Sequence, residues 1–161
     1  MADFYAAVDR VNLMTYDMIT EKGSHHSTIR NTKAAVKVLA DSGCPKSKIV
    51  VGIPAYGIHG KNPGDVKTYS EIVDALLELD PNLSRDDATQ RKSWKGYLFD
   101  SPSLVAKKAA IAKEEGLMGV FFWELGQDKQ HPEWSPGGML LETAAIEISG
   151  EASDSNTKTE L

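Results

Sequence analysis

The sequence is poor in cysteine, in excess basic charge and in long apolar runs. Its one cysteine, Cys44, excludes an internal disulfide and a cysteine-rich zinc site. No apolar run approaches the roughly 20 residues that a membrane helix requires. The formal net charge of -5 argues against a basic face for nucleic acid or an anionic membrane. We therefore predict neither a nucleic-acid partner nor a membrane partner.

The spacings typical of metal and phosphate sites are also missing. The four histidines lack the i, i+4 spacing of a zinc helix, so we predict exposed loop histidines: His25, His26, His59 and His131. Gly60, Lys61 and Gly64 do not form a phosphate-binding loop, because the Gly-Lys-Ser/Thr order is absent. We expect no metal and no cofactor.

Three apolar runs are present, at residues 11–17, 49–57 and 119–124, and each delivers an aromatic or acidic residue at its end. They predict buried strands, since they lack polar alternation. A helical pattern over about 29–40 separates the first two runs and predicts a βαβ unit. Parallel strands of (β/α) folds place functional side chains at their carboxyl ends.

The rest of the chain predicts helices and loops around these strands. Residues 58–66 contain glycines and a proline, which favour a loop. We expect further helices at about 70–80, 102–115 and 138–148, a polar irregular stretch at 82–92, and a hairpin or extended segment at 94–99. The tail, residues 150–161, is rich in Ser, Thr, Asp and Glu and predicts disorder.

The predicted fold class is therefore α/β, with about three βα units and parallel strands over residues 1–149. A closed (β/α)₈ barrel has eight such units and takes about 250 residues, so these units predict a partial barrel. Its outer strands would present unpaired edges. Either another segment covers these edges, or the chain is a piece of a longer protein.

Four stretches together resemble glycoside hydrolase family 18, the chitinase and chitinase-like family. They are Asn-Leu-Met-Thr-Tyr-Asp at 12–17, Val-Gly-Ile-Pro-Ala-Tyr-Gly at 51–57, Tyr-Leu-Phe-Asp-Ser-Pro-Ser-Leu at 97–104, and Gly-Val-Phe-Phe-Trp-Glu-Leu at 119–125 followed by Asp128. The agreement extends from about residue 8 to residue 142. The resemblance implies barrel strands six, seven and eight for the three apolar runs.

The resemblance also implies roles in binding β-1,4-linked N-acetylglucosamine polymers. Members of this family use substrate assistance, in which the acetamido oxygen of the sugar attacks the anomeric carbon. By this resemblance Tyr16 and Asp17 support catalysis, with Tyr16 holding the acetamido group. The substrate-binding residues implied are Met14, Tyr16, Asp17, Tyr56, Trp123 and Glu124. Trp123 would form the floor beneath the sugar.

The sequence departs from the family in three ways. No run of alternating aspartates ends in a glutamate, so the general acid of strand four is absent from this chain. Ile58 stands where many members have an arginine after strand seven. The stretch between strand seven and the next barrel helix looks too short for the α+β insertion of some members, which predicts a shallow, open groove.

Each candidate residue also has a plain structural interpretation. Trp123 can fill a core, since aromatic side chains bury large areas. Tyr16 and Asp17 can form an ordinary polar turn, and Tyr56 can serve packing alone. A phenol beside a carboxylate suits a hydroxyl-rich, amide-bearing ligand, because the pair supplies a donor and several acceptors.

We therefore predict part of a chitinase-type hydrolase that binds chitin or N-acetylglucosamine oligosaccharides. General acid catalysis contributes about 10²- to 10⁴-fold, so this chain alone is expected to be inactive without a partner such as the N-terminal barrel half. The alternatives are a non-catalytic, lectin-like protein and a truncated product without a stable fold. The family is usually secreted, but residues 1–4 show no signal peptide, which leaves the localisation open.

Overall fold

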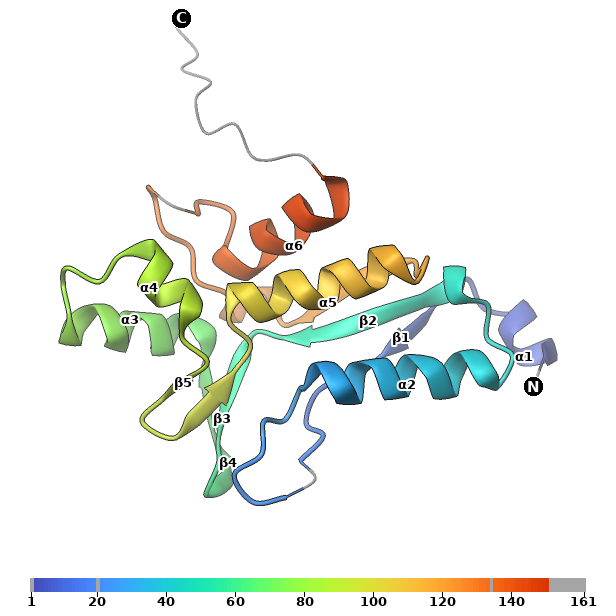
Figure 1. Cartoon of the computed structure of the whole chain (residues 1–161), viewed down its shortest axis with the longest axis horizontal. Helices are drawn as coiled ribbons and strands as arrows, with labels where there is room; N and C mark the ends of the chain where they lie inside the picture. The colour runs from blue at the N-terminus through green and yellow to red at the C-terminus, as the bar shows by residue number, and fades with distance from the viewer. Residues whose placement is uncertain (1, 20, 134, 151–161) are drawn as a thin grey trace, which may run out of the picture.

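The centre of the molecule is a three-stranded parallel sheet (Figure 1). The structure is a computed structural model that describes residues 2–19, 21–133 and 135–150, so the tail predicted to be disordered lies outside the described residues except for Gly150. The strands are β1 (Val11–Leu13), β2 (Ile49–Pro54) and β7 (Gly119–Trp123), in the order β1-β2-β7. Both pairs are parallel, which confirms the predicted α/β fold class.

The three strands differ in burial because only β2 is central. Every residue of β2 is buried, whereas β1 and β7 are largely half-buried. The prediction of three buried strands is therefore correct for β2 and wrong for the outer two, which pair on one side only within the described part of the chain. Strand β1 ends at Leu13, and beyond it the Thr15 hydroxyl donates to the Gly52 carbonyl at 2.7 Å.

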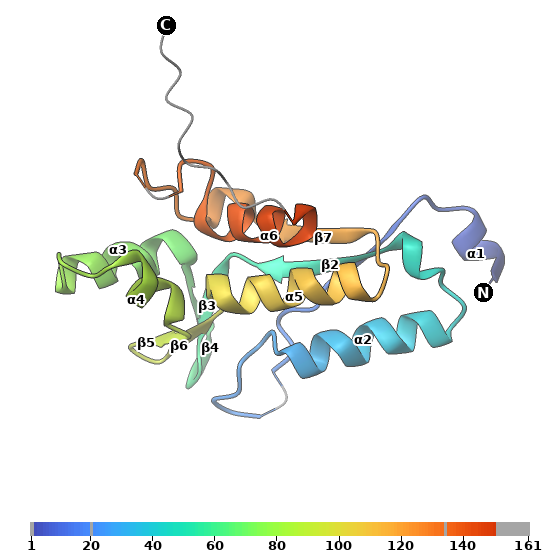
Figure 2. The ribbon, with the colours of Figure 1, turned by 45° about the horizontal axis from the view of Figure 1, so that its top comes forward.

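Three long helices pack along the parallel sheet (Figures 1 and 2). They are α2 (Ile29–Asp41), α5 (Pro102–Glu114) and α6 (Met139–Ser149), each close to its predicted range. Thr28 caps α2 by accepting the Asn31 amide, and Pro102 occupies the first turn of α5. The short helix α1 (Ala2–Ala6) and the 3-10 turn η1 (Lys46–Lys48) lie at the amino end of β2.

An α+β insertion leaves the carboxyl end of β2 and returns at α5. It holds a four-stranded antiparallel sheet of order β4-β3-β6-β5 and two helices. Its elements are β3 (Tyr56–His59), β4 (Asn62–Thr68), α3 (Tyr69–Leu79), α4 (Arg85–Gln90), β5 (Ser93–Trp94) and β6 (Tyr97–Phe99). The predicted absence of such an insertion is wrong.

Two further local predictions are wrong in this insertion. Residues 58–66 form most of a β-hairpin rather than a loop, and the polar stretch 82–92 contains α4, whose N-cap Ser84 accepts the Asp87 amide. Strand β4 is mostly exposed and carries Pro63, which an edge strand tolerates because its outer face needs no donor. Of the two alternatives predicted for residues 94–99, the structure shows the hairpin, with Lys95 and Gly96 at positive φ in its turn.

One core joins the two sheets. Ile53 of β2 packs in the same cluster as Tyr69 and Phe99 of the insertion and Leu140 of α6. The insertion is therefore anchored against the barrel-type unit and does not stand apart from it. In the described residues, no helix is long and apolar enough to cross a membrane.

Candidate functional site

A cavity of about 350 Å³ lies where the parallel strands end. Its lining includes Asp17 after β1, Tyr56 after β2, and Trp123, the last residue of β7. Trp123 stands opposite Pro54 in the register of β2 and β7, and its carbonyl accepts the Ala55 amide at 2.9 Å. The parallel register thus brings three residues that are far apart in sequence to one edge of the sheet.

The insertion supplies an apolar wall of this cavity. The side chains are Ile58 of β3 with Pro63 and Val66 of β4, and the remaining lining residues are Ile19 and Gln127. Sequence reasoning missed this wall, because it assigned residues 58–66 to a loop. The alternation of Tyr56 and Ile58, two residues apart, is the signal that indicates a shared strand face.

Asp17 and Tyr56 form a hydrogen-bonded pair inside the cavity. The Tyr56 hydroxyl donates to Asp17 Oδ1 at 2.7 Å. Burial, followed by this bond to Asp17, raises the pKa of Tyr56, so the phenol stays protonated and remains a donor. The Asp17 side chain is 60% exposed, which leaves carboxylate surface open to a ligand.

Tyr16 lies behind this pair rather than on the cavity wall. Its ring packs edge-on against Tyr56 and Phe121, each at a centroid distance of 6.3 Å. Burial, then the charge of Asp17, raises the pKa of Tyr16. The close packing requires Gly52, since a Cβ there would lie 2.7 Å from Tyr16 Cε1.

The other predicted site residues are more exposed. Trp123 is 56% exposed and presents its indole to the cavity, which argues against the role of core filler. Met14 is 68% exposed and Glu124 is also exposed, and neither is among the residues that line the cavity. Asp128 accepts the amides of Leu140 and Leu141 at the start of α6.

The prediction of exposed loop histidines is wrong: His25, His59 and His131 are half-buried, His59 lies in strand β3, and His26 is buried. The His26 side chain is 1% exposed and contacts the rings of His25 and Tyr56, at centroid distances of 5.4 and 5.3 Å. The loop after β1 folds back over the end of the strand, and this fold buries His26. Among the described residues, no group of histidine, cysteine and carboxylate side chains is placed to hold a metal ion.

A buried ion pair joins the insertion to the helical layer beside this loop. Lys108 of α5 pairs with Asp100, which follows β6, and its ammonium also donates to Ser27 Oγ at 2.5 Å. Both charged side chains are fully buried. Burial lowers the pKa of Lys108, and the attraction of Asp100 opposes that shift.

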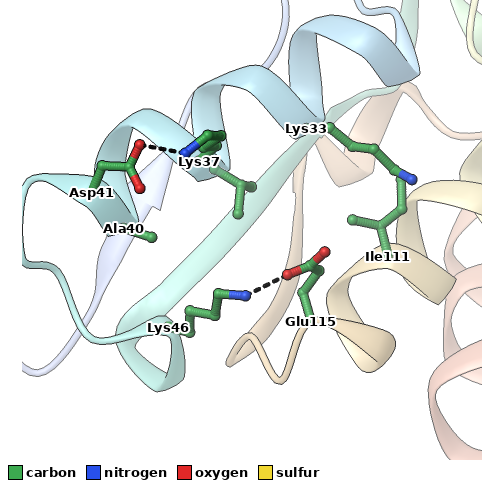
Figure 3. Close-up of a pocket in the computed structure, with 8 residues that line it drawn as sticks. Lys33, Lys37, Ala40, Asp41, Lys46, Ile111 and Glu115 are labelled. Carbon is green, nitrogen blue, oxygen red and sulfur yellow. Dashed lines mark hydrogen bonds and ion pairs between the residues drawn. The ribbon is translucent and has the colours of Figure 1, made fainter.

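Two further cavities in the described part of the chain lie away from the carboxyl ends of the parallel strands. One of about 370 Å³ separates α2 from α5 and is flanked by the ion pairs Lys37–Asp41 and Lys46–Glu115 (Figure 3). Lys46 precedes β2 and Glu115 precedes β7, so this cavity lies at the amino ends of the strands. The other is an apolar groove along α2 that includes Val38. Neither contains a predicted site residue.

The chain is similar to known proteins over most of its length. The model of glycosyl hydrolases family 18 matches residues 1–128. Endochitinase 1 of Metarhizium robertsii is 26% identical over 188 aligned positions, covering 97% of this chain and 43% of that protein. The chain spans less than half the length of the curated relatives it matches.

Solved chitinase structures share the fold. A chitinase from Bacteroides thetaiotaomicron superposes with a TM-score of 0.75 at 21% identity, covering 95% of this chain and 50% of that one. A class V chitinase mutant from Cycas revoluta, in complex with (GlcNAc)3, superposes with a TM-score of 0.70 at 23% identity, covering 91% and 48%. This chain therefore has the fold of about half of a (β/α)₈ chitinase barrel.

Proposed function

This chain belongs to glycosyl hydrolase family 18, and from that premise we propose that its strand-end cavity binds oligosaccharides of β-1,4-linked N-acetylglucosamine. The observation that carries the proposal is the meeting of Asp17, Tyr56 and Trp123 around one cavity. The complex of the Cycas revoluta relative with (GlcNAc)3 supports this ligand class.

The chemistry of the three side chains suits an N-acetylated sugar. The exposed indole of Trp123 offers a flat apolar platform for the C–H face of a pyranose ring. Asp17 supplies acceptor oxygens for a sugar hydroxyl or the acetamido N–H, while Tyr56 holds one of those oxygens in place. Tyr16 supports the Tyr56 ring from behind, and the contact of its hydroxyl with the acetamido oxygen stays a prediction, since Tyr16 does not line the cavity.

We further propose that this half-site belongs to a substrate-assisted hydrolase. In such a reaction the acetamido oxygen attacks the anomeric carbon, and a carboxylic acid protonates the leaving oxygen. Asp17 would orient the acetamido group for that attack, while Tyr16 supports the Tyr56 ring that holds Asp17. The proton donor would come from outside these residues, because the chain holds no aspartate run that ends in glutamate. No step in this scheme calls for a metal or a cofactor.

The test is a calorimetric titration of the chain with tri-N-acetylchitotriose. Trp123→Ala removes the platform and is expected to weaken affinity by about 2 kcal/mol, or roughly 30-fold, as for a buried aromatic anchor. Phe4→Ala is the matched control, since Phe4 is 60% exposed and lies on α1 at the other end of the molecule. Absence of binding by the wild type, or equal affinity in Trp123→Ala, would contradict the proposal.

The second candidate is a lectin-like protein that binds the same sugars without cleaving them. The missing aspartate run favours it for this chain by itself. Incubation with the trisaccharide and analysis of the products separates the two. The lectin is favoured if the chain binds the trisaccharide without cleaving it, and if cleavage is still absent after a proton-donating barrel half of a family member is added. Cleavage that appears only on that addition favours the hydrolase.

A further inference from the structure

His26 is a buried residue that contacts two residues of the cavity lining and has no assigned role. Its imidazole lies against the Tyr56 ring at 5.3 Å and is 1% exposed, so it cannot reach a sugar itself. Any influence on a ligand must pass through the residues that it touches. Two of those, Asp17 and Tyr56, line the cavity.

The contact with Asp17 fixes a backbone conformation. Asp17 has φ of 58°, in the left-handed region that residues other than glycine rarely adopt. Its backbone N–H donates to His26 Nδ1 at 3.3 Å, and the Met18 N–H donates to the His26 carbonyl at 2.8 Å. His26 thus accepts two consecutive amides and closes the loop after β1 upon itself.

The same contact favours one tautomer of the imidazole, in which the buried Nε2 carries the proton and has no hydrogen-bond partner among the described residues. Because Nδ1 accepts a hydrogen bond, the proton of neutral His26 resides on Nε2. A proton on Nδ1 would remove the acceptor for the Asp17 amide and direct a donor at Asp17 Oδ1, 3.5 Å away. That oxygen already accepts the Tyr56 hydroxyl, so the orientation of the pair would change.

We propose that His26 is a positioning residue for the sugar subsite: its neutral imidazole holds the Asp17 amide, and thereby aims the Asp17 carboxylate at Tyr56 and the cavity. The proposal rests on the proposed function, because it is the sugar contact of Asp17 that His26 would control. His26 itself is buried and touches no ligand.

The surroundings keep His26 neutral. Burial, then the neighbouring His25, lowers the pKa of His26 to about 4, with Lys108 acting in the same direction. Asp17 opposes the shift, and Asp100 lies beyond His25, whose Nε2 is 3.7 Å from Asp100 Oδ1. Tyr56 faces the ring as a protonated phenol.

The sign of the pH dependence follows from this depressed pKa. The unfolded chain takes up the proton near the ordinary value of 6.5, whereas the folded protein resists it until about 4. The contribution of neutral His26 to stability is therefore complete above about 6.5 and is lost as the pH falls to about 4. His26→Leu is expected to lose less stability than the wild type across this window, and an equal or larger loss in that variant would overturn the neutral assignment.

The main experiment compares two variants of the full chain. His26→Asn keeps an acceptor oxygen near the place of Nδ1, whereas His26→Leu fills the site without one. The readouts are hydrogen exchange of the Asp17 amide and affinity for tri-N-acetylchitotriose, both near neutral pH. In His26→Leu we expect faster exchange and affinity weaker by about tenfold, the size of one lost buried hydrogen bond, and in His26→Asn substantial recovery of both.

The outcomes separate this inference from the proposed function. Equal loss of affinity in both variants, with Asp17 exchange unchanged, would overturn the positioning role and indicate a packing role for the ring. If the wild type fails to bind the trisaccharide, the proposed function fails, and the exchange data alone decide whether His26 holds Asp17. Protection of the Asp17 amide that is equal in all three proteins would overturn the inference in either case.

Discussion

The parallel sheet and the antiparallel insertion are stabilised differently. Strand β2 is buried along its whole length, whereas β4 is mostly exposed and depends on pairing with β3. The first region loses stability when apolar volume is removed. The second region depends on turns, helix caps and its attachment to the shared core. The cavity uses both, since a fixed strand end supplies its polar groups and the exposed hairpin supplies its apolar wall.

The largest expected effect comes from the joint between the two regions. Lys108→Ala removes the ammonium that pairs with the buried Asp100 carboxylate, which keeps only the more distant contact with His25 at 3.7 Å, and it removes a donor to Ser27. Breaking one partner of a buried pair costs about 3–5 kcal/mol, so urea unfolding is expected to show a loss of that size. Lys107→Ala is the control, since Lys107 is exposed on the same helix. A loss no larger than in Lys107→Ala would show that the pair does not hold the regions together.

One apolar truncation in each region measures how much each depends on buried volume. Ile53→Ala on β2 removes a fully buried side chain and is expected to cost about 2–5 kcal/mol. Val66→Ala on β4 removes a side chain that is 50% exposed and is expected to cost well under half as much. Denaturant unfolding of both variants measures the difference. Equal losses would mean that the hairpin is part of the core to the same extent as β2.

A smaller loss of stability is expected from a substitution at Gly52 of β2, where the strand packs against Tyr16. A Cβ at Gly52 would lie 2.9 Å from the Leu13 carbonyl and from Phe121 Cζ, and still closer to Tyr16. Gly52→Ala is therefore expected to cost about 1–3 kcal/mol by overpacking and to displace the Tyr16 ring. Gly126→Ala is the control, since nothing lies within 4 Å of a Cβ there. Thermal unfolding measures the loss of stability, and near-ultraviolet circular dichroism reports the displacement of the Tyr16 ring. Identical behaviour of the two variants would contradict the tight packing at Gly52.

The contrast between the parallel sheet and the insertion also explains which elements could be predicted from the sequence. Apolar runs and helix caps are local signals, so β2, α2 and α5 lie close to their predicted ranges. The pairing of β3 with both β4 and β6 is not local, because β6 lies about forty residues further along the chain. Glycine, proline and polar residues in 58–66 favoured a loop by composition, and only the partner strands make that stretch a hairpin.

The candidate site, like the fold, was predictable only in part from the sequence. Strand ends identified Asp17, Tyr56 and Trp123 as neighbours, because parallel strands share one edge. The roles assigned to Met14 and Glu124 stay predictions, since neither residue lines the cavity. The burial of His26 was not predictable, because it depends on how the loop after β1 folds back onto Tyr56.

The left-handed backbone of Asp17 restricts how this pocket can be re-engineered. Aspartate, asparagine and glycine tolerate such a conformation, whereas β-branched and bulky residues are strained there. Charge at this position can therefore be removed by asparagine without disturbing the main chain, but apolar volume cannot be introduced there at small cost. A redesign of ligand preference would have to work from the hairpin side, where Ile58 and Val66 occupy ordinary extended backbone.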